Sequence, residues 1–464
     1  MNNSHLGQQV MKAVLLVEDN NELKVFSPSG SKPLNQSVQS GTMPLMLMVA
    51  GEDGQMRTAK HSDLGGGQPL VEPVNTIVID GDSITALNNV ATHYSDRGYF
   101  TWLNAFLGQS FTLVKNVGGS GQRSDQILAR LNDTIALSPD YIFVMFGVND
   151  FSQNKTAAFV LNNMKEYIKR AQSAGIRVIA STATPTSKWT TQQQKTEYYR
   201  YNRALKEYAR TQPGLILVDM GSAYLTQDAT AAALNHTVDE THPSALGAVK
   251  MAKIAAAEIK KHITLVPSTL SRSKDDPDNL LVNGVMYGTG GSTAQGTGAT
   301  VSGTVPDGWV LGGYVSGTTV TATKKANVDY PGDHLYVSLV GGTNLGNALL
   351  YREVSPATQP LSVWAVGDNV YGQIELEIAV GSDITNIEFG IDCRTNSPSA
   401  TVAQYYGLFH ESAAPNLSYS PSGRLTLRTP TFKVPATVDR LRLLLRITGT
   451  KADYDVYLAD LRKA

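Results

Sequence analysis

Cysteine is almost absent from this sequence: Cys393 is the only one among 464 residues. An intramolecular disulfide is therefore excluded, and the fold must be held together by packing. We expect Cys393 to be a buried free thiol, because an isolated cysteine usually behaves as a small apolar side chain.

An excess of charge of one sign is also lacking. The sequence has 39 Lys and Arg residues and 40 Asp and Glu residues, which gives a formal net charge of -1. This balance predicts neither a nucleic-acid nor a membrane partner. No stretch approaches about 18 consecutive apolar residues, and the first residues lack the basic run, apolar core and small-residue cleavage site of a secretory signal. We therefore expect a soluble chain without its own Sec signal.

The chain is too long for one ordinary hydrophobic core. Changes in the pattern of apolar and polar residues along it predict four regions. Residues 1–74 alternate β-like runs with turn formers, which indicates a small β-rich leader for attachment or oligomerisation. Residues 75–265 alternate apolar runs with helical periodicity, which predicts an α/β domain with a mostly parallel sheet covered by helices on both faces. The polar residues 266–279 indicate a linker, and residues 280–464 show the short alternating runs typical of a β-sandwich.

Five apolar runs of the α/β region predict its strands. They are TIVID (76–80), FTLVKNV (111–117), YIFVMFG (141–147), IRVIAST (176–182) and LILVDM (215–220). Polar residues follow several of these runs, and the carboxyl ends of parallel strands meet at the edge of the sheet where ligands bind.

Two motifs place a serine and a glycine-rich turn at this edge. In IDGDSIT (79–85) the apolar strand ends and the chain turns at Ser83. In KNVGGSGQRS (115–124) the glycines let backbone N–H groups approach a developing oxyanion. Each motif by itself is at least as typical of an ordinary turn.

Two further motifs supply an amide and an acid–base pair. Asn149 in FGVND (146–150) can donate a hydrogen bond to an oxyanion, although Asn-Asp after a strand is often only a helix cap. In VDETHPS (238–244), Asp239 and His242 stand three residues apart, so one loop can present an imidazole and the carboxylate that orients it. All four motifs occur in order at strand ends and carry the residue types that nucleophilic acyl transfer requires. No clustered His or Cys spacing indicates a metal site.

The four motifs resemble blocks I, II, III and V of the SGNH (GDSL-like) hydrolase family, over about residues 75–265. The resemblance implies a three-layer α/β/α, flavodoxin-like domain that acts as a serine esterase with no cofactor and no metal. The site residues it implies are Ser83 as the nucleophile, Asp239 and His242 as its triad partners, and Ser83, Gly121 and Asn149 as oxyanion donors.

Two further positions bear on the resemblance. Asn116 matches the asparagine of block II, and the resemblance implies a structural role for it. Glu240 departs from the family, because many members have glycine there. This departure concerns the shape of the loop and not its chemistry.

The C-terminal region resembles, more loosely, the jelly-roll fold of carbohydrate-binding modules, through DNLLVNGVMYGTGGS at its start and TVDRLRLLLRITGTKADYDVYLADLRKA at its end. Its aromatic residues include Trp309, Tyr314, Trp364 and Tyr371. Such rings can stack on sugars, but most aromatic residues of a sandwich belong to its core.

The order of β-rich leader, SGNH domain and jelly roll resembles bacteriophage tail-spike or tail-fibre proteins. That resemblance implies an esterase that removes O-acetyl groups from a host capsule or O-antigen, a homotrimer, and attachment of the leader to the virion tail. Two alternatives remain: a secreted carbohydrate acetyl esterase of polysaccharide degradation, and a receptor-binding adhesin without turnover. The sequence does not determine the polysaccharide, the host or the acyl-chain preference.

Overall fold

The computed structural model describes residues 75–464 apart from residue 91 and residues 226–235, 329–331, 343–344, 357–363 and 412–417, and before residue 75 it describes only the backbone of five short strands. The chain divides into two compact units, Met1–Val71 and Glu72–Ala464. In the first unit, β1 (Leu15–Asp19), β2 (Glu22–Ser27) and β3 (Gly30–Pro33) form an antiparallel sheet, and β4 (Leu47–Ala50) pairs with β5 (Met56–Ala59).

The second unit begins with a five-stranded parallel sheet. Its strands are β6 (Asn75–Gly81), β9 (Phe111–Asn116), β10 (Tyr141–Met145), β11 (Arg177–Ser181) and β12 (Ile216–Val218). They stand in the order β12-β11-β10-β6-β9, and all neighbours are parallel. The five apolar runs are thus confirmed as strands, in the flavodoxin-like order in which the first strand lies inside the sheet. Every residue of β10 is buried, as expected for a sheet covered on both faces.

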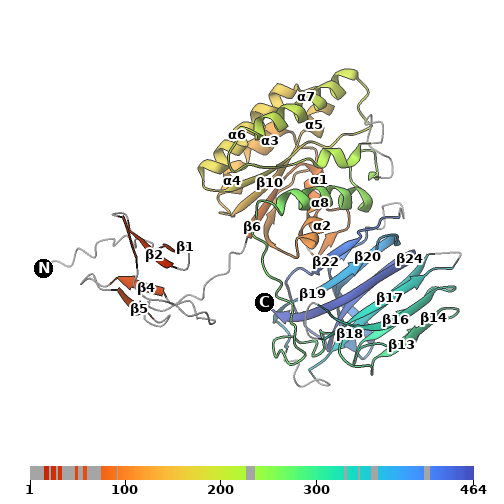
Figure 1. The fold of residues 1–464 in the computed structure, drawn as a ribbon. Coiled ribbons are helices and arrows are strands. Elements are labelled where there is room, and N and C mark those ends of the chain that lie inside the picture. The colour runs from red at the N-terminus through yellow and green to blue at the C-terminus, as the bar shows by residue number, and fades with distance from the viewer. Residues whose placement is uncertain are drawn as a thin grey trace. The chain divides into compact units, whose positions relative to one another are not determined.

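Helices cover both faces of this sheet and make three layers (Figure 1). One face carries α2 (Tyr99–Phe106) and α8 (Ala245–Ile259), and the other carries α3 (Ser124–Ala129), α4 (Leu131–Ile135), α6 (Ala157–Ser173) and α7 (Gln192–Ala209). Two short helices, α1 (Ser83–Ala86) and α5 (Val148–Ser152), and the 3₁₀ turn η2 (Met220–Tyr224) directly follow strands or their connecting turns. None of the described helices is long and apolar enough to cross a membrane.

The rest of the second unit is a large β-rich region. Its strands are β13 (Ser292–Gln295), β14 (Thr300–Gly303), β15 (Val310–Gly313), β16 (Thr319–Ala326), β17 (Asp333–Val340), β18 (Gly346–Val354), β19 (Asn369–Ile378), β20 (Asp383–Asn396), β21 (Ser399–Phe409), β22 (Gly423–Arg428), β23 (Phe432–Lys433) and β24 (Arg440–Lys463). The long strand β24 pairs with β18 and β20 along its first half and with β17 and β19 along its second half. The jelly-roll topology itself stays a prediction.

The core of the β-rich region contains several side chains that the sequence singled out. Cys393 is fully buried, which confirms the expected free thiol. Trp309 and Trp364 are buried, whereas Tyr314 is 44% exposed. The two tryptophans therefore belong to the packing of the region.

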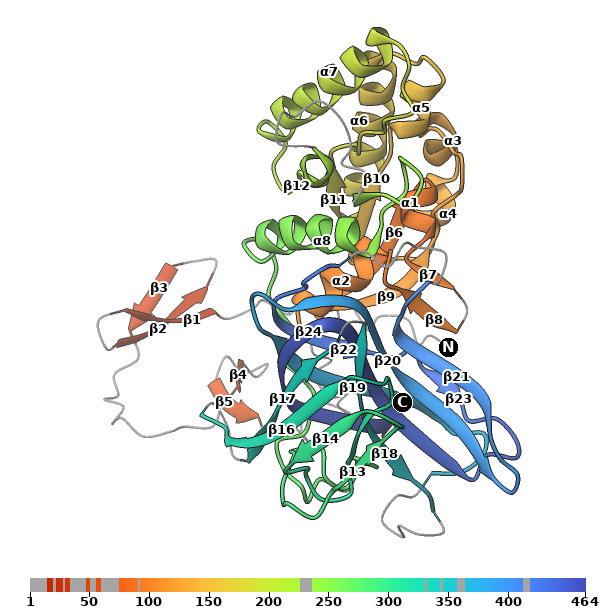
Figure 2. The same ribbon diagram turned by 90° about the vertical axis from the view of Figure 1, so that its right-hand side faces the viewer.

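The α/β part and the β-rich region belong to one compact unit, and two short strands of the α/β part join the sheet of the β-rich region. Between α1 and α2 the chain forms β7 (Asn89–Val90) and β8 (His93–Ser95), and β8 pairs with β21 of the β-rich region. Figure 2 shows β8 beside β21, below the sheet that contains β6. The β-rich region is thus joined to the segment that directly follows Ser83 and α1.

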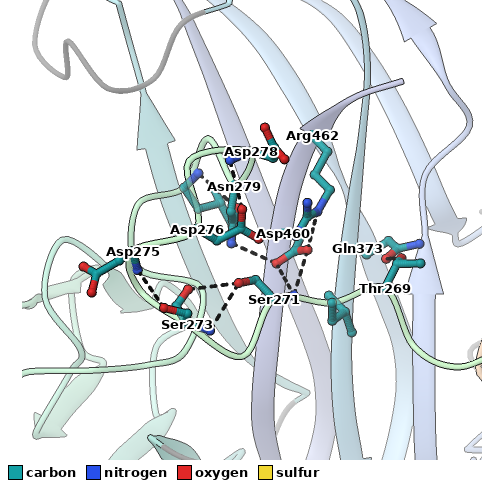
Figure 3. A network of polar contacts seen from close by, with 12 residues as sticks. Thr269, Ser271, Ser273, Asp275, Asp276, Asp278, Asn279, Gln373, Asp460 and Arg462 are labelled. Carbon is teal, nitrogen blue, oxygen red and sulfur yellow. Dashed lines mark hydrogen bonds and ion pairs between the residues drawn. The ribbon is translucent and has the colours of Figure 1, made fainter. Parts of the chain in front are cut away.

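The segment 266–279, predicted as a linker, is bound to the end of β24 (Figure 3). The fully buried carboxylate of Asp460 accepts hydrogen bonds from the Ser271 amide and from Asn279 Nδ2. Arg462 pairs with Asp460 and also with Asp276, at 2.6 Å in each case. These charge-assisted contacts fix the path of the chain between the two parts of the unit.

Candidate active site

Ser83 lies at the first position of α1, directly after the buried strand β6. Asp82 caps this helix, because its side chain accepts a hydrogen bond from the Ile84 amide at 3.0 Å. Asp82 is almost fully buried, and burial, reinforced by the nearby Asp150 carboxylate, raises its pKa to about 7 against the opposing effect of the Ile84 hydrogen bond. Strand, cap and helix together fix the backbone that presents the Ser83 hydroxyl.

The loop before α8 brings the predicted triad together. His242 Nε2 lies 2.8 Å from Ser83 Oγ, and His242 Nδ1 lies 2.8 Å from Asp239 Oδ2. In the tautomer that donates its Nδ1–H to Asp239, Nε2 accepts the hydrogen bond of the Ser83 hydroxyl. Ser83 and His242 are half-buried, 159 positions apart in the sequence.

Asp239 is held in its ionised form. Its partial burial raises its pKa, but the backbone and side-chain hydrogen bonds from His242 and the Thr241 amide outweigh that effect and lower the pKa to about 2. Lys188 Nζ lies 3.7 Å from Asp239 Oδ2 and adds a neighbouring positive charge. The carboxylate can therefore orient His242 and stabilise its protonated form.

The backbone of Glu240, between Asp239 and His242, has an unusual conformation. Its φ is +70°, in the left-handed region that glycine adopts at least cost. The Glu240 carbonyl accepts a hydrogen bond from Thr186 Oγ1 at 2.8 Å and from the Ser187 amide at 3.3 Å. These contacts hold the strained residue, so the loop has the conformation expected of glycine.

The predicted oxyanion donors lie on two adjoining turns. Gly121 stands in the exposed turn after β9 with φ +73°, and Asn149 lies in the first turn of α5. Asn149 Nδ2 donates to the Gln122 carbonyl at 3.0 Å, which joins the two turns and leaves the second amide hydrogen available. Behind them the buried Asp150 accepts hydrogen bonds from the Ser124 amide and hydroxyl, at 2.9 and 2.6 Å.

Asn116 and the glycine-rich turn are tied to the serine helix. Asn116 Nδ2 donates to the Thr85 carbonyl at 2.9 Å, and its Oδ1 accepts from the Gly118 amide. A Cβ on Gly118 would lie 2.4 Å from the Ala86 nitrogen, so only glycine permits this approach. These contacts support the structural role implied for Asn116.

Several residues that support the site carried no signal in the sequence. Arg97 Nε donates to the carbonyl of Pro243, the residue after His242, at 3.0 Å, and Arg97 also pairs with Glu411 of the β-rich region at 3.3 Å. Next to this pair the buried Asp96 contacts His410 Nδ1 at 2.7 Å. Arg97 is 146 positions from Pro243 and 314 positions from Glu411, and neither this spacing nor the residue types predict the contacts.

This arrangement has the components of nucleophilic acyl transfer: a hydroxyl, an imidazole within hydrogen-bond distance of it, and a carboxylate that orients the imidazole. Among the described residues, no group of three or more His, Cys, Asp or Glu side chains has an arrangement that could hold a metal ion.

Comparisons with known proteins bear on the α/β part. No curated protein sequence matches the chain. Solved structures similar to it include a GDSL-like lipase from Bacteroides thetaiotaomicron (22% identity, 42% of this chain and 93% of that chain, TM-score 0.34) and a member of the lipolytic G-D-S-L family from Veillonella parvula (21%, 40% and 99%, TM-score 0.34). A catalytic mutant of an acetylxylan esterase from Geobacillus stearothermophilus is also similar (19%, 42% and 97%, TM-score 0.35).

A family model matches residues 81–249, which include the serine, the glycine-rich turn, the asparagine and the acid–base loop. The matched segment therefore contains every predicted site residue. This match supports the assignment of the α/β part of the chain to the GDSL-like lipase/acylhydrolase (SGNH) family, and with it an esterase or acylhydrolase activity.

Proposed function

We propose that the chain is a serine esterase in which Ser83 is the nucleophile, His242 the general base and Asp239 the residue that orients His242. The observation that carries the proposal is the continuous series of 2.8 Å contacts from Ser83 Oγ through the His242 ring to Asp239. The family match of residues 81–249 supports the same chemistry.

The reaction follows from this geometry. His242 Nε2 takes the proton of the Ser83 hydroxyl as Oγ attacks the ester carbonyl, and the ionised Asp239 stabilises the imidazolium that forms. His242 then protonates the leaving alcohol, and the acyl group remains on Ser83. Water, activated by the same imidazole, releases the acid and restores the hydroxyl.

The tetrahedral oxyanion needs donors on the other side of the carbonyl. We assign this role to the amides of Ser83 and Gly121 and to Asn149 Nδ2. The hydrogen bond from Asn149 to Gln122 supports the assignment, because it fixes the side chain beside the glycine-rich turn before substrate arrives. Such preorganised donors are each worth roughly 10²–10³ in rate.

For the substrate, we propose the O-acetyl groups of a bacterial surface polysaccharide, a capsule or an O-antigen, and a place for the chain in a bacteriophage tail spike. This proposal is supported by the order of the regions in the sequence, a β-rich leader followed by the esterase and a β-rich region. A homotrimer and attachment of residues 1–74 to the virion tail belong to the same proposal.

Acetate release tests this function. Purified O-acetylated capsule is incubated with the wild-type chain, with Ser83→Ala and with Ser173→Ala, which alters an exposed serine at the end of α6. We expect acetate from the wild type and the Ser173 variant alone, and none from capsule that was de-O-acetylated beforehand. Absence of acetate with every acetylated polysaccharide, despite hydrolysis of small esters, would contradict the proposed substrate.

The oligomeric state separates the tail-spike proposal from a secreted esterase. Light scattering of the full chain is expected to give the mass of three copies. A monomeric mass would contradict the homotrimer and favour the secreted carbohydrate acetyl esterase. Failure to hydrolyse any ester would favour the adhesin instead.

A further inference from the structure

Three cavities follow the junction between the α/β part and the β-rich region, where α2 lies beside β22 in both ribbon views (Figures 1 and 2). Their volumes are about 340, 420 and 610 Å³. The first and second share Gln109, Thr112 and Arg428, and the second and third share Gly108, Val266, Ser268 and Thr426. We call these three adjoining cavities the junction groove.

The guanidinium of Arg428 stands where the first and second cavities of the junction groove meet. One face of Arg428 lies over the ring of Tyr371, 3.8 Å from its centroid. Within the described residues, no carboxylate forms an ion pair with this guanidinium and no acceptor forms a hydrogen bond with it. Its planar set of N–H donors is therefore fixed by stacking and available to a ligand, and it matches a carboxylate best.

The third cavity adds positive charge. Lys253 and Lys260 line it, and neither forms an ion pair with a carboxylate in the part of the chain that the structure describes. Lys253 Nζ is anchored by Ser422 Oγ at 3.2 Å and lies 5.6 Å from the Phe106 ring centroid. The acid in this cavity, Glu375, is already paired with Arg424. The groove therefore carries three cations, Arg428, Lys253 and Lys260, that form no ion pair with any carboxylate of the described residues.

The first cavity provides surfaces suited to a sugar ring. The half-buried Tyr94 contributes an aromatic ring and the exposed Thr112 contributes a hydroxyl, whereas the other aromatic residues of this cavity, Phe100 and Phe111, are buried in the core. Apolar ring faces beside fixed polar groups are what the two sides of a pyranose require. An anion without such a ring would leave this part of the groove unused.

Ser83, Asp239 and His242 line none of the three cavities of the groove. The groove borders Phe111, the first residue of β9, whereas Ser83 follows the last residue of β6. These strands are parallel, with Asn75 opposite Phe111, so this part of the groove lies toward the other end of the sheet from Ser83, whereas the first cavity also extends to Asn88, two residues after α1. A ligand in the junction groove does not occupy the acyl-transfer site.

We propose that the junction groove binds a stretch of acidic polysaccharide, with the carboxylate of a uronic-acid-type sugar on Arg428 and further acidic residues of the same chain on Lys253 and Lys260. The groove would hold the polymer while Ser83 removes its ester groups. That second role rests on the proposed function, whereas binding in the groove does not.

Binding of fluorescent oligogalacturonate to the full-length Ser83→Ala chain tests the proposal. We expect saturable binding that weakens with salt and that loses at least about tenfold in affinity in Arg428→Gln, as for the loss of a charge-assisted hydrogen bond. Arg428→Lys should retain part of the binding and Lys253→Gln should reduce it. Arg446→Gln is the matched control, because Arg446 pairs with Glu388 and does not line the groove.

The outcomes are separable from those of the esterase proposal. Neutral oligogalactose should not bind, and each Arg428 variant with wild-type Ser83 should still hydrolyse p-nitrophenyl acetate at the wild-type rate. Equal affinity in folded Arg428→Gln, or binding of polyphosphate without binding of oligogalacturonate, would overturn the groove proposal alone. Uronate binding that weakens in Arg428→Gln, in a chain that hydrolyses no ester, would uphold the groove and contradict only the esterase.

Discussion

Substitution of Arg97 tests whether contacts outside the catalytic triad position His242. Its side chain is 10% exposed and donates to the Pro243 carbonyl while it pairs with Glu411. It is thus the link between the β-rich region and the loop that carries His242. We predict that Arg97→Ala lowers kcat and leaves KM for a small ester nearly unchanged, because the substituted group positions the base and does not touch the substrate.

The magnitude follows from the contacts that are lost. A hydrogen bond from a charged donor to a buried carbonyl contributes about 1.5–3 kcal/mol, and the partly exposed pair with Glu411 contributes at most about 1 kcal/mol. The free energy of unfolding should fall by about 1.5–4 kcal/mol. A displacement of His242 by about 1 Å costs up to roughly 10²-fold in rate, so we expect kcat to fall about 10- to 100-fold.

The assay is the steady-state hydrolysis of p-nitrophenyl acetate, at a temperature well below the unfolding midpoint of each variant. Glu411→Gln, which preserves the bond from Arg97 to Pro243, should stay within about threefold of wild type. Arg446→Ala removes a comparable ion pair of the β-rich region, away from the loop, and should leave kcat unchanged. A folded Arg97→Ala variant with kcat within about twofold of wild type would refute the reasoning.

Three further predictions concern single residues. Burial raises the pKa of Asp82 from 3.8 to about 7, so folded Asp82 keeps a proton that the unfolded chain has lost, and stability from this group falls as pH rises between those values. The unfolding midpoint of Asp82→Asn minus that of wild type should therefore increase from pH 4 to pH 7 and level off above it; a difference independent of pH would contradict the assignment. Glu240→Gly removes the strain of the +70° φ and should raise the free energy of unfolding by up to about 1 kcal/mol in chemical denaturation, with activity retained; a clear loss of stability would show that the side chain contributes more than its backbone costs. Burial, and secondarily Asp392, raises the pKa of the Cys393 thiol to about 12, so a disulfide reagent should titrate one thiol per chain only after unfolding; rapid reaction in the native chain would contradict the burial.

The sequence predicted the α/β part well because its signals are local. Strands such as β10 are buried on both faces and read as uninterrupted apolar runs. Ser83, Asn149 and His242 each stand in a short motif next to a strand or helix end, and a parallel sheet brings such ends to one edge. Their roles in catalysis remain predictions that the measurements above address.

What the sequence could not supply are contacts between distant segments. The bond from Arg97 to Pro243 and the pairing of β8 with β21 depend on how two parts of the chain pack, which no periodicity encodes. That none of the described carboxylates pairs with Arg428 is likewise visible only in the structure. Glu240 lies between these cases. The sequence alone shows a residue other than glycine at this position, but only the structure shows its left-handed backbone.

The most direct test of the central claim is the hydrolysis of p-nitrophenyl acetate by the full chain and by Ser83→Ala, with both proteins shown to be folded. We expect turnover by the wild type and a loss of at least about 10³-fold in kcat for the variant. Undiminished hydrolysis by Ser83→Ala, or a folded wild-type chain that hydrolyses no ester, would contradict it.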